Sequence, residues 1–337
     1  MKSEGTFART LFSRMTIEQL RGLIEEEIGN LQFKSEPENL YQPMAYMLGL
    51  GGKRIRPLLV LLGYSLFKND PEKIAKQALS VEVFHNFTLM HDDIMDKAPI
   101  RRGQPSVHEK WNETTAILSG DTMMIRAYEL LENVSPEYLP EAMKLFNQCA
   151  IEVCEGQQLD MNFEKQGEVS EEEYLEMIRL KTAVLLGFSL QFGGLLAGAN
   201  EEAQSQLKEL GIDLGLAFQL MDDHLDTFGD AATFGKQIGG DILANKKTFL
   251  LITALANSSP EDKTQLLSWM NKTAFNDQHK IEAVRNIYKE CGAETVSLKK
   301  IQSYESKALA ILKSLEGIQS IKSMIEKYLH QLKQRVE

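Results

Sequence analysis

Apolar residues recur at intervals of three and four positions over long stretches of the chain, as they do on one face of an α-helix. This spacing is clear in residues 83–94 and 207–225, and it predicts another helix over Thr114–Val134. Alternation of apolar and polar residues between turn signals, which is typical of strands, is not convincing anywhere in the sequence. The sequence therefore predicts an all-α protein.

Proline and glycine positions indicate how the predicted helices are joined. Eight of the nine prolines lie at or before Pro140 and the ninth is Pro260, so several helices can follow one another between these two. Many of them are apolar almost all round, which is typical of a large bundle with a buried centre. Linkers rich in Gly, Ser or Pro are missing, and we therefore predict one domain over residues 1–337.

The same spacing predicts which side chains are buried. In the helix over Thr114–Val134 the expected core residues are Ile117, Leu118, Met124, Ala127, Tyr128 and Leu130. The pair Gly193-Gly194 is expected to allow two helices to pack closely. Amphipathic helices are expected around residues 280–289, 298–315 and 321–335.

Composition narrows the class of protein. The chain is 43% hydrophobic and 25% charged, close to the average of soluble globular proteins. A formal net charge of −11 disfavours nucleic acid as a partner, and no apolar run reaches the ~20 residues that span a bilayer. Cys149, Cys154 and Cys291 lack metal-binding spacing and are expected to be buried thiols in a reducing compartment. We therefore expect a cytoplasmic protein without a transmembrane segment.

The segment His91–Asp96 carries the first candidate chemistry. Asp92 and Asp96 are four positions apart and would share one helix face, with their Cβ atoms about 5–6 Å apart. Such carboxylates repel each other unless a cation lies between them, and Mg²⁺ is bound by carboxylates together with substrate phosphates. An acidic run is more often a solvated helix face, but this one follows the apolar residues 83–90. That position favours a site near the core or at the mouth of a cavity.

A second D-D-x-x-D cluster, Asp222–Asp226, lies far along the chain and also ends an apolar helix, residues 212–221. Two such clusters on separate helices could face each other across a cavity. Together they would bind a polyphosphate through metal ions better than one cluster could. Because two accidental surface runs would both have to follow hydrophobic helices, the pairing favours a functional site.

Basic residues close to these clusters favour an anionic ligand. Residues 51–57, G-G-K-R-I-R-P, place cations just before a helix for which Pro57 suits the first position. A helix N-terminus with Lys and Arg side chains is a good phosphate site. Further cations are Arg101, Arg102, Lys181, Lys236, Lys246 and Lys247. Each lysine alone would be an ordinary surface residue, but acid and base together indicate a phosphate site bridged by metal.

Taken in order, these motifs resemble those of the trans-isoprenyl diphosphate synthases, the polyprenyl synthetase family. The match runs from Gly51 to Thr248 and includes G-G-K-R-x-R-P, D-D-x-x-D followed by R-R-G, K-T, F-Q-x-x-D-D-x-x-D and G-K-x-x-G-G-D. The resemblance implies an all-α bundle around a central cavity, usually as a homodimer. It also implies a prenyltransferase that uses Mg²⁺ to condense isopentenyl diphosphate with an allylic diphosphate.

The resemblance assigns roles by position. The direct metal ligands would be Asp92, Asp96 and Asp222, and the aspartates that support them would be Asp93 and Asp226. The side chains that bind the allylic diphosphate would be Arg101, Lys181, Lys236 and Lys246. The side chains that bind the diphosphate of isopentenyl diphosphate would be Lys53, Arg56, His85 and Arg102. Thr182 and Gln219 would lie near the reacting carbons, and they complete a catalytic set with Lys181 and Arg101.

The implied chemistry follows from charge. Metal ions and cationic side chains would neutralise the leaving diphosphate as its C–O bond breaks. The double bond of isopentenyl diphosphate would attack the allylic cation, and the departing diphosphate would accept the proton that is then lost. No Ser-His-Asp or Cys-His nucleophile is required.

Product length would depend on bulky residues upstream of the first aspartate motif, which form the floor of the chain pocket in the family. Phe87 lies five positions before Asp92, with Phe84 and Thr88 beside it and no insertion in the motif, as in short-chain synthases with C15 or C20 products. A helical wheel places Thr88 on the aspartate face, Phe84 to one side and Phe87 nearly opposite. From the residues alone Phe87 is a core residue, so both interpretations stand at this point.

Other activities remain as alternatives. A terpene cyclase of the same fold would carry an Asn/Ser/Glu-type second metal motif in place of Asp222-Asp223-x-x-Asp226. A longer-chain polyprenyl diphosphate synthase would share every motif. A non-catalytic subunit would be expected to lose aspartates or the Arg101-Arg102 pair. A purely structural bundle would leave two acidic clusters uncompensated, at a cost of roughly several kcal/mol.

Overall fold

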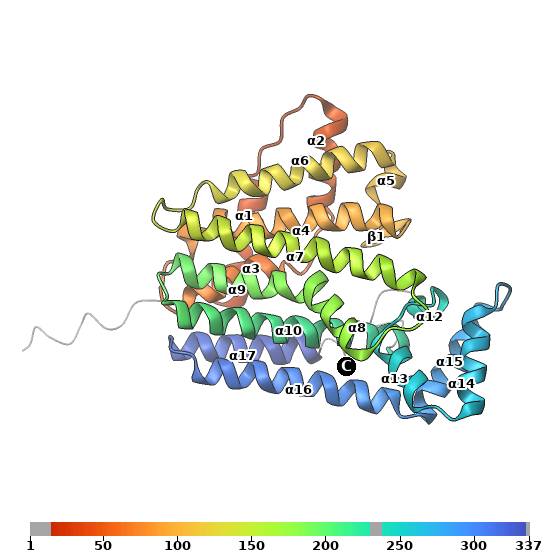
Figure 1. Ribbon diagram of the computed structural model, residues 1–337. Coiled ribbons are helices and arrows are strands. Elements are labelled where there is room, and N and C mark those ends of the chain that lie inside the picture. Colours follow the sequence, from red (N-terminus) through yellow and green to blue (C-terminus); the bar gives the residue numbers. More distant parts are fainter. Residues whose placement is uncertain (1–14, 230–237, 335–337) are drawn as a thin grey trace, which may run out of the picture. The chain divides into compact units, whose positions relative to one another are not determined.

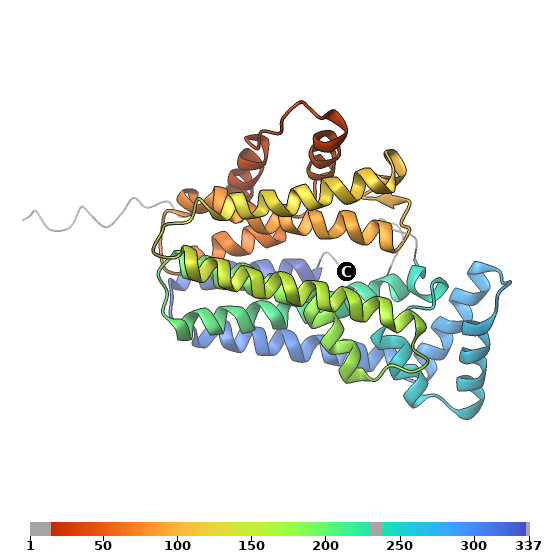
Figure 2. The same cartoon turned by 45° about the horizontal axis from the view of Figure 1, so that its top comes forward.

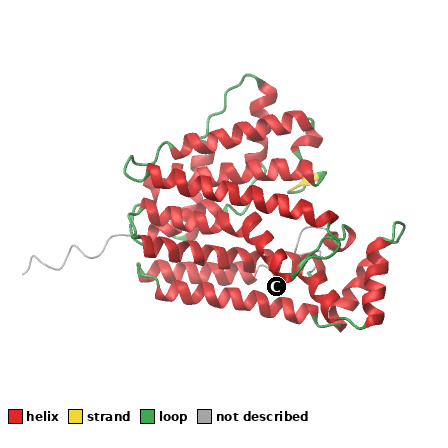
Figure 3. Ribbon diagram, viewed as in Figure 1, coloured by secondary structure: helices red, strands yellow, loops and turns green. Residues whose placement is uncertain are grey.

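The computed structural model describes residues 15–229 and 238–334, and most of this part of the chain is helical (Figure 3). Two short strands, β1 (Ile100–Arg101) and β2 (Gln104–Pro105), form an antiparallel hairpin in which Arg101 pairs with Gln104. The prediction of an all-α protein is confirmed. No helix in the described part of the chain is both long enough and apolar enough to cross a membrane.

By their internal packing the described residues fall into two compact units. Unit 1 comprises those within Met1–Lys144, Ser189–Gln204 and Gly317–Met324. Unit 2 comprises those within Leu145–Phe188, Ser205–Glu316 and Ile325–Glu337. The helices labelled in Figure 1 and their short companions are α1 (Ile17–Gly29), α2 (Glu38–Gly49), α3 (Ile55–Ser65), η1 (Pro71–Ile74), α4 (Ala75–Met95), α5 (Val107–Lys110), α6 (Glu113–Leu131), α7 (Leu139–Lys165), α8 (Glu171–Ile178), η2 (Arg179–Ala183), α9 (Val184–Leu196), α10 (Glu201–Phe228), α12 (Gly240–Leu243), α13 (Phe249–Asn257), α14 (Pro260–Asn271), α15 (Asp277–Glu290), α16 (Ala293–Ser314) and α17 (Gln319–Gln334).

Unit 1 is built around α3 and α4. In α3 every residue from Pro57 to Ser65 is buried. A Cβ atom at Gly193 would press on the backbone carbonyl of Val60, so α3 and the unit 1 part of α9 approach backbone to backbone. Figures 1 and 2 show α4 and α6 lying side by side. The prediction that Gly193 serves close helix packing is confirmed.

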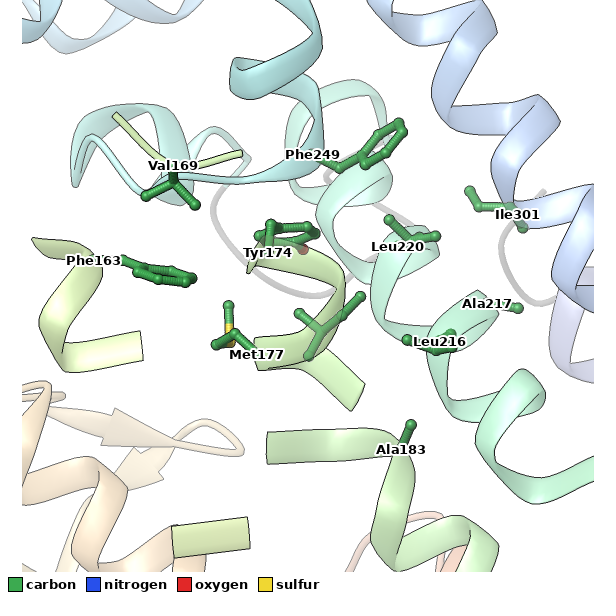
Figure 4. Close-up of a cluster of buried hydrophobic side chains, with 11 residues drawn as sticks. Phe163, Val169, Tyr174, Met177, Ala183, Leu216, Ala217, Leu220, Phe249 and Ile301 are labelled. Atoms are coloured by element: carbon green, nitrogen blue, oxygen red, sulfur yellow. The ribbon is translucent and has the colours of Figure 1, made fainter. Parts of the chain in front are cut away.

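Unit 2 has a core of its own, shown in Figure 4. Its buried members are Phe163, Val169, Tyr174, Met177, Ile178, Ala183, Leu216, Ala217, Leu220, Phe249 and Ile301. The rings of Tyr174 and Phe249 lie 6.5 Å apart, and they join α8 to α13. At the crossing of α9 and α10, a Cβ on Gly187 would lie 2.8 Å from the backbone carbonyl of Lys208, so small residues set this spacing as well.

The helix predicted over Thr114–Val134 is α6, and the helices predicted near the C-terminus are α15, α16 and α17, but the start of α3 differs from its prediction. Helix α3 begins at Ile55, two residues before Pro57, because Arg54 adopts the left-handed conformation (φ 46°) and forms the N-cap. Pro57 is still tolerated, since the first N–H groups of a helix have no carbonyl partner within it. The expectation that Pro57 occupies the first position is therefore wrong.

Two burial predictions are also wrong. Ile117 and Leu118 on α6 are 46% and 57% exposed, whereas Ala127 and Leu130 of the same helix are buried as expected. The three- and four-residue spacing identifies apolar positions but cannot say whether the chain itself covers them. Cys149 is buried, but Cys154 is exposed and Cys291 is partly exposed, so the three are not all buried thiols.

Candidate active site

The first aspartate cluster lies at the C-terminal end of α4. The Asp96 N–H donates to the Asp92 carbonyl at 2.8 Å, so the helical path continues through the cluster and places these two side chains one turn apart on one face. Asp92 is half-buried and Asp96 is exposed. Asp93, about 100° further round the helix, is buried inside unit 1. The outer two carboxylates thus face one way and the middle one another.

Arg101 connects the β-hairpin to this cluster. Its Nε donates to Asp93 Oδ1 at 3.0 Å, and its Nη2 donates to the same oxygen and lies 3.8 Å from Asp92 Oδ2. Burial raises the pKa of Asp93, and the positive charge of Arg101 opposes that rise. Asp93 therefore anchors Arg101 next to Asp92.

The following residue, Arg102, turns toward the glycine pair. Its Nη1 donates to the Gly51 carbonyl, and a Cβ atom at Gly52 would lie 2.9 Å from its Cζ. Gly51 and Gly52 have φ angles of 75° and 140°, which residues with side chains rarely adopt. The glycine pair thus permits the close approach of the Arg102 guanidinium to the loop that carries Lys53, whose side chain is exposed.

Arginine charges surround His85, two turns before Asp92 on α4. Burial lowers the pKa of His85 well below its usual range, and the positive charges of Arg56, Arg102 and Arg101 lower it further. His85 is therefore neutral at physiological pH. A neutral imidazole among guanidinium groups is an arrangement that favours an anion such as a diphosphate.

Arg54 is the exception among these cations. Its Nη1 lies 2.7 Å from Glu82 Oε1 and its Nε lies 3.0 Å from Glu25 Oε1. Its Nη2 donates to the Leu48 carbonyl at 2.7 Å. Within G-G-K-R-I-R-P, Arg54 thus links α1, α2 and α4, while Lys53 and Arg56 are the cations that could meet a ligand.

The second cluster lies in the last two turns of α10 in unit 2. Asp222 and Asp226 are one turn apart on this continuous helix. Asp223 is buried, accepts a hydrogen bond from the Tyr174 hydroxyl, and accepts another from Gln219 Nε2 at 3.0 Å. Burial and the nearby charge of Asp241 raise the pKa of Asp223 well above its usual range. Each motif thus has two outer carboxylates and a buried middle one.

Lys181 and Thr182 lie on η2, a π-helical turn between α8 and α9, and such turns are frequent at functional sites. Lys181 Nζ donates to Asp160 Oδ2 at 2.6 Å. Thr182 Oγ1 donates to Gln219 Oε1 at 3.1 Å. Since Gln219 donates in turn to Asp223, one network of hydrogen bonds joins η2 to the second aspartate cluster.

The second cluster also contacts the segment that begins at α12. The Asp241 N–H donates to Asp226 Oδ2 at 2.9 Å, and Lys246 Nζ lies 3.9 Å from Asp241 Oδ1. The Lys246 side chain is half exposed. Asp226 thereby orients the segment that carries Lys246. The predicted site residue Lys236 lies outside the described residues.

The proposed chain-length residues lie on α4 before the cluster. The rings of Phe84 and Phe87 are 5.6 Å apart, and the Phe87 ring packs edge-on against His91 at 4.8 Å. Phe84 and Phe87 are both buried. Thr88 is partly exposed, and its hydroxyl donates to the His85 carbonyl at 2.8 Å.

The donor set fits Mg²⁺. Each motif offers two carboxylates one turn apart, and Mg²⁺ usually binds one or two carboxylates and completes its shell with water and substrate phosphates. Within residues 15–229 and 238–334, no set of three His, Cys, Asp or Glu side chains lies close enough together to enclose a metal ion without such a substrate.

Four residues that take part in the networks around the second cluster had no predicted role: Asp160, Tyr174, Asp223 and Asp241. Asp223 could have been predicted, because a helical wheel turns the middle aspartate about 100° away from the outer two. Asp160 and Tyr174 contact Lys181 and Asp223 across 21 and 49 residues of sequence, and helical periodicity does not predict such pairings.

Comparison with known proteins identifies the family. The profile of the family described as Polyprenyl synthetase matches residues 37–289, and the chain belongs to that family. The short chain isoprenyl diphosphate synthase of Methanothermobacter thermautotrophicus is 37% identical over 283 residues, which are 84% of each chain. Other relatives are named geranylgeranyl and geranylfarnesyl diphosphate synthases.

Solved structures give the same result. A geranylgeranyl pyrophosphate synthase is 43% identical and superposes with a TM-score of 0.92, over 96% of this chain and 100% of that one. The geranylgeranyl pyrophosphate synthase of Corynebacterium glutamicum, complexed with isoprenyl diphosphate and magnesium, is 27% identical with a TM-score of 0.83, over 95% of this chain and 98% of that one.

Proposed function

We propose that this chain is a trans-prenyltransferase that condenses isopentenyl diphosphate with an allylic diphosphate to give a short-chain trans-prenyl diphosphate. The repeated geometry of the two D-D-x-x-D motifs carries the proposal. In each, two carboxylates lie one turn apart on a long helix, and the middle aspartate is bonded inside the protein. Such pairs suit a metal that also binds a diphosphate.

In this proposal Mg²⁺ would be held by Asp92 on α4, by Asp96 at the C-cap of that helix and by Asp222 on α10, with Asp226 in support. When bound, it supplies positive charge that neutralises the leaving diphosphate. Asp93 contributes indirectly, since it anchors Arg101 beside Asp92.

The two diphosphates are held by different sets of cations. Isopentenyl diphosphate is bound by Lys53, Arg56, His85 and Arg102. The support is that Arg56 and Arg102 lie close enough to His85 to lower its pKa. The allylic diphosphate is bound by Arg101, Lys181, Lys236 and Lys246. Holding both substrates in fixed positions converts the encounter of two reactants into a step within one complex.

Thr182 and Gln219 act beside the reacting carbons. Gln219 accepts from Thr182 and donates to Asp223, so its amide is held in one orientation by two hydrogen bonds. A fixed carbonyl dipole stabilises positive charge that develops on the allylic carbon as its C–O bond breaks. The departing diphosphate accepts the proton that is lost after the new C–C bond forms.

We propose a C15–C20 product whose length is limited by Phe84, Phe87 and Thr88. Phe87→Ala is expected to lengthen the main product by about one or two C5 units, because it removes a buried ring beside Phe84. Val60→Ala, buried in α3, controls for a loosened core. An unchanged product distribution from Phe87→Ala would favour the interpretation of Phe87 as a core residue.

We further propose that residues 1–337 form one domain that works as a homodimer in the cytoplasm. The outer side of α6 carries the exposed apolar residues Ile117, Leu118 and Ile125, which supports a dimer. The three cysteines are free thiols, which supports a reducing compartment.

Product analysis tests the proposed function. Purified protein is incubated with Mg²⁺, radiolabelled isopentenyl diphosphate and dimethylallyl, geranyl or farnesyl diphosphate in turn, and the dephosphorylated alcohols are separated by chromatography. C15 or C20 alcohols that disappear with EDTA are expected. Longer alcohols would support the prenyltransferase reaction but contradict the proposed C15–C20 product length. Hydrocarbons would identify a terpene cyclase, and no elongation from any primer would reject the synthase.

A further inference from the structure

Lys280 is a buried lysine to which neither the motifs nor the proposed reaction gives a role. It lies in the first turns of α15 in unit 2 and is 1% exposed. Its Nζ donates to Asn245 Oδ1 at 2.7 Å and to the Leu243 carbonyl at 3.4 Å. The same Nζ lies 4.3 Å from the centre of the Phe275 ring.

This charge is stabilised without an ion pair in the part of the chain that the structure describes. An amide oxygen, a backbone carbonyl and an aromatic face are its contacts. Burial lowers the pKa of Lys280, and the negative charge of Asp277, three residues earlier on α15, opposes that shift. Burying an ammonium is unfavourable unless its hydrogen bonds are satisfied, so an apolar side chain of the same length would suit packing alone. The role of the Lys280 charge can therefore be inferred from the two groups that accept its hydrogen bonds.

Both acceptors belong to the turn that follows α12. Leu243 is the last residue of α12, whose carbonyl end attracts a positive charge. Asn245 adopts the left-handed conformation (φ 53°), and its Nδ2 donates to the Met270 carbonyl at 3.1 Å. Lys280 and Met270 thus hold the Asn245 side chain from two sides, and the next residue along the chain is Lys246.

The turn contacts the second aspartate cluster at its other end. The Asp241 N–H donates to Asp226, and the Lys246 N–H donates to the Asp241 carbonyl at 2.9 Å. Asp241, Asn245, Lys246 and Lys280 line one small pocket together with Tyr288. A shift of Asn245 would therefore move the backbone of both Asp241 and Lys246.

We propose that Lys280 is a positioning residue, whose ammonium fixes the Leu243–Thr248 turn and thereby places Lys246 against the allylic diphosphate. The proposal rests on the proposed function for the role of Lys246, but the contact with the turn does not depend on it. Lys280 acts only through Asn245 and Leu243 and does not touch substrate.

The test uses Lys280→Met, which keeps the length and removes the charge. Amides of residues 242–248 are expected to exchange hydrogen about tenfold faster than in the parent protein without metal or substrate, because the turn opens more often. The KM for the allylic diphosphate is expected to rise about tenfold while kcat changes much less, since ground-state and transition-state binding weaken together. Val284→Ala is the matched control, because Val284 lies one turn further along α15 and lines the same pocket but makes no polar contact with the turn.

Asn245→Gly provides a second route to the same contact, since glycine accepts the left-handed conformation and lacks the amide. It should reproduce both effects even if Lys280→Met folds poorly, and the double variant should be no worse than either single one. Equal hydrogen exchange and KM in Lys280→Met and Val284→Ala would overturn the proposal and leave Lys280 as a packing residue. Failure of the parent protein to elongate any primer would reject the proposed function, while the exchange experiment would still decide whether Lys280 fixes the turn.

Discussion

Asp93 and Asp223 occupy the middle position of the two D-D-x-x-D motifs, and both side chains lie inside the protein. Consecutive residues on a helix diverge by about 100°, so a middle aspartate cannot face the same ligand as the outer two. Inside, each meets protein donors: Arg101 for Asp93, and Tyr174 with Gln219 for Asp223. A single motif therefore supplies both metal ligands and the anchor that orients neighbouring side chains.

The outer aspartates are expected to affect turnover and not stability. Asp222→Asn should lower kcat by about 10²–10³-fold or more, because it removes a carboxylate that would hold metal beside the leaving diphosphate. Its melting temperature should match that of the parent protein, and Mg²⁺ with inorganic diphosphate should no longer raise that temperature as it does in the parent. Glu209→Gln, an exposed carboxylate on the same helix, is the control. Turnover close to normal in Asp222→Asn would reject the metal site.

His85 should make stability depend on pH. Its pKa is lowered in the folded state, so below about pH 6.5 the unfolded chain binds a proton that the folded chain does not. The contribution of His85 to the free energy of unfolding should therefore be fully present above that pH. Below it, the free energy of unfolding should fall by up to about 1.4 kcal/mol per pH unit. In His85→Gln this contribution is lost, so urea unfolding at several pH values should show a shallower decline. Parallel curves would contradict the lowered pKa.

At the scale of helices, apolar spacing predicted α4, α6 and α10 well because these helices are long and their apolar positions repeat over several turns. Periodicity did not predict where α3 begins, since that depends on the left-handed conformation of Arg54. It also placed Ile117 in the core, because an apolar face looks the same whether this chain or a partner covers it.

For the candidate site, too, the sequence predicted the local motifs but not the contacts between elements. The aspartates, the glycine pair and the arginine pair are local motifs, and their spacing on a helix or hairpin is visible in the sequence. The Asp160–Lys181 pair depends on how α7 packs against η2, and the burial of Arg54 depends on where Glu82 lies. Periodicity within one element does not predict such contacts between elements.

Close packing of α3 and α9 requires glycine at position 193. In Gly193→Ala the new methyl group would overlap the Val60 carbonyl, and we expect a loss of about 3 kcal/mol in the free energy of unfolding. Gly22→Ala is the matched control, because nothing lies within 4 Å of its Cβ position on the exposed side of α1. It should stabilise the protein by about 0.5–1 kcal/mol through helix propensity. Urea titrations of both variants measure the two values, and equal effects would contradict the backbone contact.

At the scale of the whole chain, each unit holds one aspartate motif with its own cations: Arg101 in unit 1, and Lys181 and Lys246 in unit 2. Neither unit is continuous in sequence, and the chain passes between them five times. Four of these passages lie inside helices α7, α9, α10 and α17, and the fifth lies in the loop between α16 and α17. This connectivity favours a chain that acts as one domain.

The outer side of α6 favours a second copy of the chain as partner. Leu118 and Ile125 are 57% and 61% exposed, and residues seven apart lie on one helix face. An apolar stripe of this kind is unfavourable in water and usually marks an interface. Leu118→Glu combined with Ile125→Glu would place two charges in that interface, and we expect it to convert a dimer into a monomer.

Light scattering after size-exclusion chromatography measures the outcome. The parent protein should have twice the chain mass of 38.1 kDa, and the double variant should have the mass of one chain. Leu267→Glu, an apolar position on α14 that is 41% exposed, introduces the same charge elsewhere and should leave the dimer intact. A monomeric parent, or a double variant that stays dimeric, would remove α6 from the interface. If the monomer also loses activity while it keeps its melting temperature, the active site depends on the partner, because the substituted residues lie outside both aspartate motifs.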